Sequence, residues 1–497
     1  MRTNNQLIGD EAEKRRSLLR RSRNHRQDKF DSTDLFERAS IPRAVASLAL
    51  PAVASQLVVL AYNMADTWFI GQTGDPAQVA ALTATFPIYM LLNAVSNLFG
   101  VGGGSLVSRS LGAHDEQRAR RVATASAWLA VVFSLVAGAI LLLVAEPLLR
   151  LLGTPEAVMP HARAFLWFAA SAGAAPTVTG LVLASMLQAQ GKPGVASAGM
   201  CMGVLLCIAL DPAFIFGLDL GVAGAALATA IANTASMLFF IGYFIRNRKW
   251  LQVPIAARPS RPAGADLREI FAVGFPAAAI IALGSLSNGV LVALLSSAPV
   301  TAESGLGVVQ KLELVPSFQL IMGVTGGVAP LVAYCSKSGN RARMRATMRF
   351  VLAIALAAAA FVLVIYEALA EPLVSLFVSD AESVAFGAAF LRLRILALPA
   401  IVVEFALNSA FQATGRSKQS LTVSVMRKGT IDLPLMIALN AIWPIYGLML
   451  VQPIMEFVTA LTAIALWVRL DNRNTDKRKE GIAQRQSRPA AAKAVTQ

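Results

Sequence analysis

Two acidic residues, Asp66 and Asp211, stand inside long apolar stretches of the sequence, where an ionised carboxylate is costly. Asn63 lies one helical turn before Asp66 on the same face, and Thr229 lies in a third apolar stretch. Two acids, an amide and a hydroxyl could converge on a buried cation. Apolar surroundings favour the neutral form of a carboxyl, so such acids can exchange protons near neutral pH. The alternative role of either acid alone is a structural hydrogen bond.

The second half of the chain carries a different set of charges inside apolar stretches. Lys428 and Asp432 are four residues apart on one helix face, which favours an internal ion pair over a titrating site. Glu404 has no basic residue four positions away and is a secondary candidate for ion coupling or for contact with cations. Lys311 and Glu313 are too close in sequence to face each other, and either could line a substrate path.

Motifs for enzyme chemistry are missing from the sequence. The run Gly100–Gly104 is not followed by Gly-Lys-Ser/Thr, so it is no phosphate loop, and small residues in a span favour close helix packing. The cysteines Cys201, Cys207 and Cys335 have neither a disulfide nor a metal-site spacing. We therefore expect no enzyme, no catalytic residues, no metal site and no cofactor other than H⁺ or Na⁺ as coupling ion.

The elements that must position these residues are membrane-spanning helices. Of 497 residues, 56% are hydrophobic and 15% are charged, and the mean hydropathy is +0.59. Soluble domains have roughly 45–50% apolar and about 25% charged residues. A span needs about 20 apolar residues, and this sequence offers many such runs, whereas β-barrel strands alternate over ~10 residues. The composition excludes a soluble, fibrous or disordered protein and predicts an all-α polytopic membrane protein.

Twelve apolar runs are long enough to cross the membrane, with short polar breaks between them. They lie near residues 45–71, 79–108, 122–148, 161–189, 194–217, 221–245, 267–297, 304–335, 345–370, 385–413, 418–443 and 445–469.

Basic residues alternate between the loops. Lys and Arg crowd both termini and the second, sixth, eighth and tenth loops, whereas the intervening loops hold only Arg150. Arg163, Arg392 and Arg394, near outer span ends, depart from this pattern. The alternation predicts a plasma (inner) membrane protein with both termini in the cytoplasm. This topology explains the net charge of +15, so no nucleic-acid partner is expected. The first 40 residues have the pattern of a cytoplasmic tail and lack that of a signal peptide.

The chain repeats itself about a long sixth loop. Leu50-Pro51 is matched by Phe275-Pro276, and Asp211-Pro212 by Leu433-Pro434, at offsets of about 222–227 residues. Because six is an even number of spans, the halves are parallel repeats, an architecture typical of alternating-access carriers. The predicted units are a basic tail (1–42), an N-lobe of spans one to six (43–246), a linker (247–266), a C-lobe of spans seven to twelve (267–470) and a second basic tail (471–497).

At these positions the chain resembles the MATE (multidrug and toxic compound extrusion) transporters, closest to their DinF-like branch. The likeness runs from about residue 43 to 470. Its specific segments are Leu50-Pro51 through Asn63-Met-Ala-Asp66-Thr67 with Gly71, the Gly100–Gly112 stretch, Asp211-Pro212 with Gly221 to Thr229, and Gln452-Pro453.

The resemblance implies a V-shaped fold of two six-helix lobes and efflux of cationic, often aromatic compounds driven by H⁺ or Na⁺. It implies an N-lobe cation site at Asp66, Asp211 and Thr229. An asparagine four residues before the second acid completes that site in the branch, and Cys207 stands there in this chain. A neutral thiol is a poor ligand for a hard cation, so this departure favours protons. The middle of span seven has no glutamate, so the C-lobe sodium site of the NorM-like branch looks incomplete.

The hypothesis from the sequence is a secondary active antiporter, expected to be a monomer, that exports cationic or amphipathic drugs or toxic metabolites. Protonation of Asp66 and Asp211 reorganises the N-lobe around span one, with Pro51 as hinge. The alternative is a lipid-linked oligosaccharide flippase of the same broader superfamily. Such a flippase needs many Arg and Lys residues to hold pyrophosphate, and these are sparse in the spans.

Overall fold

The computed structural model describes residues 35–73, 75–151, 154–249, 251–256, 263–295, 299–313, 320–378 and 380–494. Within these ranges, some side chains lie outside the description. They are those of residues 63, 64, 67, 71, 76, 79, 83, 151, 292, 293, 295, 300, 303, 304, 311 and 471–494.

The first half of the chain forms six helical spans. They are α2 (Ile41–Gly71), α3 (Pro76–Gly112), α4 (Glu116–Leu151), α5 (Met159–Phe168) continued by the π-helical turn η1 (Ala169–Gly173) and α6 (Ala174–Ala189), α7 (Pro193–Pro212) with the π-helical turn η2 (Ala213–Gly217), and α8 (Gly221–Arg246).

The second half repeats this order. Its elements are α9 (Gly264–Leu295), α10 (Val300–Glu313) and α11 (Ile321–Lys337), α12 (Arg341–Ala368), the short α13 (Ala370–Ser375), α14 (Ala381–Ile395) and α15 (Leu398–Ala413), α16 (Ser417–Val425) with the π-helical turn η4 (Met426–Ile431) and α17 (Asp432–Ile442), and α18 (Tyr446–Ala494).

The predicted all-α fold is confirmed, since no strand occurs in the described residues. Nine helices of the described chain are long and apolar enough to cross a membrane, and α14 with α15, bent by 45°, makes a tenth span. The other two of the twelve expected spans correspond to α10 with α11, on either side of residues 314–319, and to α16, η4 and α17.

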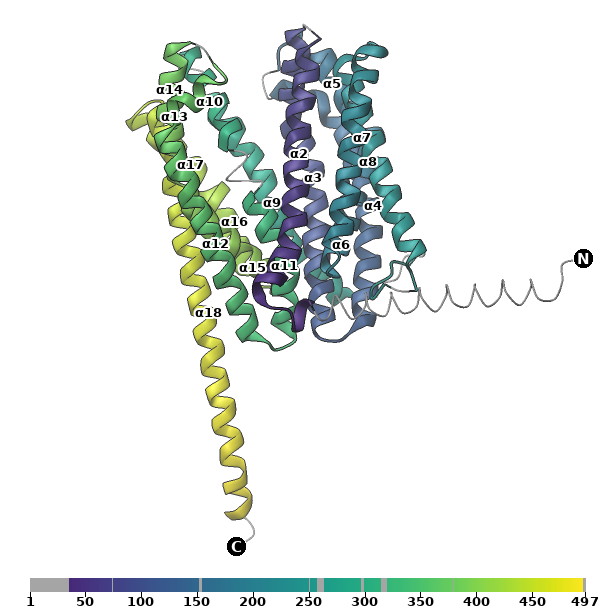
Figure 1. The fold of residues 1–497 in the computed structure, drawn as a ribbon, viewed down its shortest axis with the longest axis vertical. Helices are drawn as coiled ribbons and strands as arrows, with labels where there is room; N and C mark the ends of the chain where they lie inside the picture. The colour runs from purple at the N-terminus through teal and green to yellow at the C-terminus, as the bar shows by residue number, and fades with distance from the viewer. Residues whose placement is uncertain are drawn as a thin grey trace, which may run out of the picture.

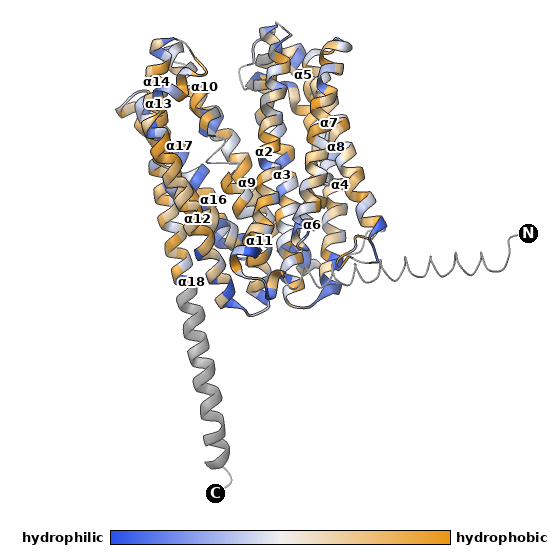
Figure 2. Cartoon of the chain, in the orientation of Figure 1, coloured by the Kyte–Doolittle hydropathy of each residue, from blue (hydrophilic) through white to orange (hydrophobic). Residues whose placement is uncertain are grey.

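The outer faces of the helices are apolar. Leu143 is 80% exposed, Phe361 68% and Leu50 67%, and the apolar colour runs along much of the length of the helices (Figure 2). Exposed apolar area on this scale is typical of a surface that lipid covers. Alanine and glycine are frequent among the buried residues, as expected where helices pack closely in a membrane.

Two groups of helices, the N-lobe and the C-lobe, lie together at one end and diverge towards the other (Figure 1). The loops at the end where they meet are hydrophilic (Figure 2). There α3 packs against α9, and α2 against α11. A Cβ atom on Gly274 of α9 would lie 1.9 Å from the carbonyl oxygen of Leu98, and one on Gly102 of α3 would lie 2.3 Å from that of Ile270. The two backbones therefore meet without room for a side chain.

Charged side chains also join the two lobes at this end. Arg118 of α4 donates from Nε to Asp266 at 2.8 Å and from Nη2 to Glu269 at 2.9 Å, both on α9. Arg109 of α3 donates from Nη1 to Glu269 at 3.2 Å. Two arginines of the N-lobe thus hold the start of the C-lobe.

Candidate functional site

The N-lobe brings four of its five predicted site residues together. Asp66 of α2 and Asp211 of α7 are 7% and 0% exposed and lie close enough to interact electrostatically. Cys207, one turn before Asp211, places its Sγ atom 3.8 Å from Asp211 Oδ1 and 3.6 Å from Thr229 Oγ1 on α8. Three helices therefore supply two carboxyls, a thiol and a hydroxyl to one buried site.

Tyr62 belongs to the same site, and sequence reasoning missed it. Its hydroxyl lies 2.8 Å from Thr229 Oγ1. Tyr62 lies four residues before Asp66 in α2, so the helical spacing that selected Asn63 could also have found it. We call Tyr62, Asp66, Cys207, Asp211 and Thr229 the N-lobe site.

The two carboxyls keep free acceptor capacity. Asp66 Oδ1 and Asp211 Oδ2 are buried and have no hydrogen-bond partner among the described residues. No lysine or arginine of the described chain forms an ion pair with either acid. A buried carboxylate without a partner is costly, so each acid gains from binding a proton or a metal cation. The arrangement can therefore bind and release a small cation.

The side chains of two predicted residues, Asn63 and Lys311, are not among those that the structure describes. Pro51 lies inside α2, which is a single helix from Ile41 to Gly71. The carbonyl oxygen of Pro51 accepts hydrogen bonds from Ser197 at 2.7 Å and from Ser55 at 3.0 Å. The first of these bonds ties α2 to α7, and the hinge role of Pro51 stays a prediction.

In the C-lobe, Lys428 and Asp432 form the ion pair expected from their spacing. Lys428 Nζ lies 3.1 Å from Asp432 Oδ2, and Ser287 of α9 donates to the same oxygen. Glu313 of α10, a candidate for lining the substrate path, instead accepts hydrogen bonds from Nε and Nη2 of Arg394 on α14, at 2.9 Å each. These two acids therefore have cationic partners.

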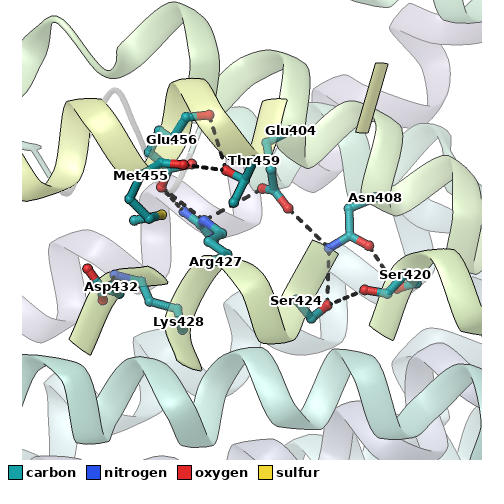
Figure 3. A network of polar contacts seen from close by, with 10 residues as sticks. All are labelled: Glu404, Asn408, Ser420, Ser424, Arg427, Lys428, Asp432, Met455, Glu456 and Thr459. Atoms are coloured by element: carbon teal, nitrogen blue, oxygen red, sulfur yellow. Dashed lines mark hydrogen bonds and ion pairs between the residues drawn. The ribbon is translucent and has the colours of Figure 1, made fainter. Parts of the chain in front are cut away.

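Glu404 lies on α15 and is 0% exposed. No basic residue of its own helix pairs with it, but Arg427 of η4 approaches to 3.7 Å. Arg427 also binds Glu456 of α18, so a buried cluster of charges lies between three helices (Figure 3). Arg427 and Glu456 were not predicted, because no local spacing connects them to Glu404.

The fold and the site together define a class of protein. Two parallel repeats of six spans, with buried carboxyls that have no basic partner among the described residues, are typical of a multi-pass membrane transporter. A model of the MatE family matches residues 51–213 and 276–438, one match in each half. The chain is 30% identical to the multidrug export protein MepA of Staphylococcus haemolyticus, over 88% of this chain and 96% of MepA. It is 29% identical to MepA of Staphylococcus aureus strain MSSA476 over the same shares.

This chain therefore belongs to the MATE family, and it is a transporter and not an enzyme. Solved structures have the same fold. The outward-facing conformation of a MATE family transporter of the MOP superfamily superposes with a TM-score of 0.82 at 23% identity, covering 89% of this chain and 98% of that one. The Vibrio cholerae MATE transporter VcmN in the bent form superposes with a TM-score of 0.77 at 22% identity, covering 88% and 97%. The family prediction is confirmed; the DinF-like branch stays a prediction.

Proposed function

We propose that this chain is a multidrug efflux antiporter that exports cationic or amphipathic compounds in exchange for protons. Relatives that are multidrug export proteins, nearly full-length in the alignment, support the export of drugs. The alternation of basic loops supports a plasma-membrane protein with both termini in the cytoplasm. The moving units are the N-lobe (43–246) and the C-lobe (267–470) of a single chain.

The N-lobe site is the observation on which this proposal rests. Two buried carboxyls, Asp66 and Asp211, lie close enough to interact electrostatically and have no basic partner among the described residues, so their charge state responds to proton supply. Cys207 occupies a position where an oxygen ligand would favour Na⁺. A neutral thiol binds hard cations poorly, which favours the proton as the coupling ion.

The coupling follows from electrostatics. Protons that arrive from outside neutralise Asp66 and Asp211, remove their repulsion and let α2 shift against α7 and α8, with Pro51 as hinge. That shift expels the substrate, and proton release to the cytoplasm restores the first state. Two protons that enter for one monovalent cation that leaves move one net charge inward, which at ~100 mV supplies about 2.3 kcal/mol. This free energy supports a substrate gradient of roughly 50-fold.

The decisive experiment separates the two candidate ions. In vesicles that contain the full chain, ethidium efflux is measured under an imposed pH gradient without Na⁺, and under a Na⁺ gradient at equal pH. We expect efflux with the first gradient and none with the second. Efflux driven only by Na⁺ would contradict proton coupling, and absence of efflux under both gradients would contradict drug export.

Replacing Cys207 with asparagine is expected to let Na⁺ compete with protons, because an amide oxygen is a better ligand for a hard cation than a thiol. Ethidium efflux under a Na⁺ gradient should rise from background to a measurable rate. Cys201→Asn, two turns earlier in α7 and without a contact to Asp211 or Thr229 among the described hydrogen bonds, is the matched control. Equal Na⁺ response of both variants would contradict a ligand role for position 207.

A further inference from the structure

Three buried charged residues of the C-lobe lie on different helices and bring their side chains together (Figure 3). Glu404 of α15, Arg427 of η4 and Glu456 of α18 are 0%, 4% and 1% exposed, and we call them the C-lobe triad. Arg427 donates from Nε at 2.9 Å and from Nη2 at 2.6 Å to Glu456 Oε1. The same Nε atom lies 3.7 Å from Glu404 Oε2, so one guanidinium faces two carboxyls.

The two carboxyls are unequally satisfied. Glu456 accepts both short bonds from Arg427. Among the described residues, Glu404 Oε1 accepts only from the amide of Asn408, at 3.2 Å, and that amide also reaches Ser424 at 3.4 Å. Glu404 Oε2 and Glu456 Oε2 are buried without a hydrogen-bond partner among the described residues. The guanidinium of Arg427 therefore binds mainly Glu456, and the hydrogen-bond donor of Glu404 is the neutral amide of Asn408.

The charges around the triad do not balance. The charged groups that face Glu404 are Arg427 and Lys428 of η4 and Glu456 of α18. Lys428 is already paired with Asp432 at 3.1 Å. Three carboxylates and two cations leave one excess negative charge if all five ionise. A buried charge without a counter-charge is strongly unfavourable, and uptake of one proton removes this penalty.

We propose that the C-lobe triad is a second proton-binding site, in which Glu404 carries one exchangeable proton next to the Arg427–Glu456 pair. Binding forms an O–H bond on a Glu404 carboxyl oxygen with a proton delivered by H₃O⁺, which leaves as water. Release of the proton leaves Glu404 ionised, and the carboxylates of Glu404 and Glu456 must then share the guanidinium of Arg427. The protein thus holds proton sites in both lobes, and this one does not depend on proton coupling at the N-lobe site.

The location gives this proton a structural effect. The triad joins α15, which is bent by 45° against α14, to the wide turn of η4 and to α18. π-helical turns occur preferentially at functional sites. Loss of the proton from Glu404 strengthens its attraction to Arg427 and pulls η4 towards α15. The packing of three C-lobe helices therefore responds to protonation.

Infrared difference spectroscopy of the full chain in lipid nanodiscs tests this proposal, because a protonated carboxyl has its own C=O stretch. All spectra are recorded in an Asp66→Asn, Asp211→Asn background, so that the N-lobe acids do not contribute. We expect a buried carboxyl band that disappears as the pH rises. Glu404→Gln should remove that band, whereas Glu382→Gln, at an exposed glutamate of the same lobe, should keep it.

Glu456→Gln gives the more diagnostic result. It removes the excess negative charge, so Glu404 becomes the ionised partner of Arg427 and the band should vanish although Glu404 is intact. A purely structural role of Glu456 would leave the band in place, and that result would overturn the proposal, as would absence of the band from the background protein. The variants Glu404→Gln and Glu456→Gln are measured separately. If Glu404→Gln fails to fold, the Glu456→Gln spectrum still tests the proposal. Na⁺-driven efflux would contradict the proposed function and leave this test unaffected.

Discussion

Asp66→Asn is expected to abolish proton-driven efflux while the protein remains folded and inserted. Asparagine has the same shape as a protonated aspartate but cannot release a proton, so the N-lobe site would stay in one charge state. Ethidium efflux from vesicles under an imposed pH gradient should fall to background. The gradient of roughly 50-fold that ~100 mV can support should fall to unity.

Asp219→Asn is the matched control for this loss. Asp219 lies between η2 and α8 with a φ of 52°, a left-handed conformation that asparagine tolerates well. The control removes the same charge from the same lobe without touching the N-lobe site, and its efflux should equal that of the parent. Full activity of Asp66→Asn would contradict a coupling role for this acid.

Gly274→Ala is expected to separate the two lobes at the end where they now meet. The added methyl group would lie 1.9 Å from the carbonyl oxygen of Leu98, and a backbone atom cannot rotate away as a side chain can. Overpacking costs about 1–3 kcal/mol, which reduces the population of the observed arrangement roughly 5- to 150-fold. Efflux should fall accordingly. Cys335 of α11 is 1% exposed and follows Tyr334, whose carbonyl oxygen would lie 2.3 Å from a Cβ atom on Gly112 of α3, so its labelling by a thiol reagent should accelerate when the lobes separate.

Gly284→Ala lies on the same helix, α9, and no atom lies within 4 Å of its added Cβ atom. This control makes the same substitution without a clash and should transport normally. If Gly274→Ala transports and labels like Gly284→Ala, the contact between α3 and α9 does not limit the transport cycle.

The fold could be predicted from the sequence because membrane helices leave a strong and local signal. The apolar runs located the spans, and the paired prolines of Leu50-Pro51 and Phe275-Pro276 exposed the repeat that the two family matches reproduce. The N-lobe site could be predicted from the sequence for a related reason. Asp66 and Asp211 are conspicuous in apolar surroundings, and helical spacing connects Asp211 to Cys207.

The C-lobe triad could not be predicted, because its partners are far apart in sequence. A search at four-residue spacing finds Lys428 and Asp432, but Glu404, Arg427 and Glu456 meet only after three helices have packed. A wide π-helical turn at η4 also changes which face each of its residues presents, so Arg427 was overlooked beside Lys428.

The arrangement of the triad has a consequence for the biogenesis of the chain. Glu404, Arg427 and Glu456 belong to the tenth, eleventh and twelfth spans, so the guanidinium reaches the translocon before its main counter-ion has been synthesised. Before the last span arrives, the triad offers Arg427 only Glu404, whose Oε2 atom lies 3.7 Å from Nε, so the two short bonds to Glu456 form last. Helix α18 therefore completes the charge pairing of its predecessors, and a chain whose synthesis stops before α18 would leave Arg427 with only the longer contact to Glu404.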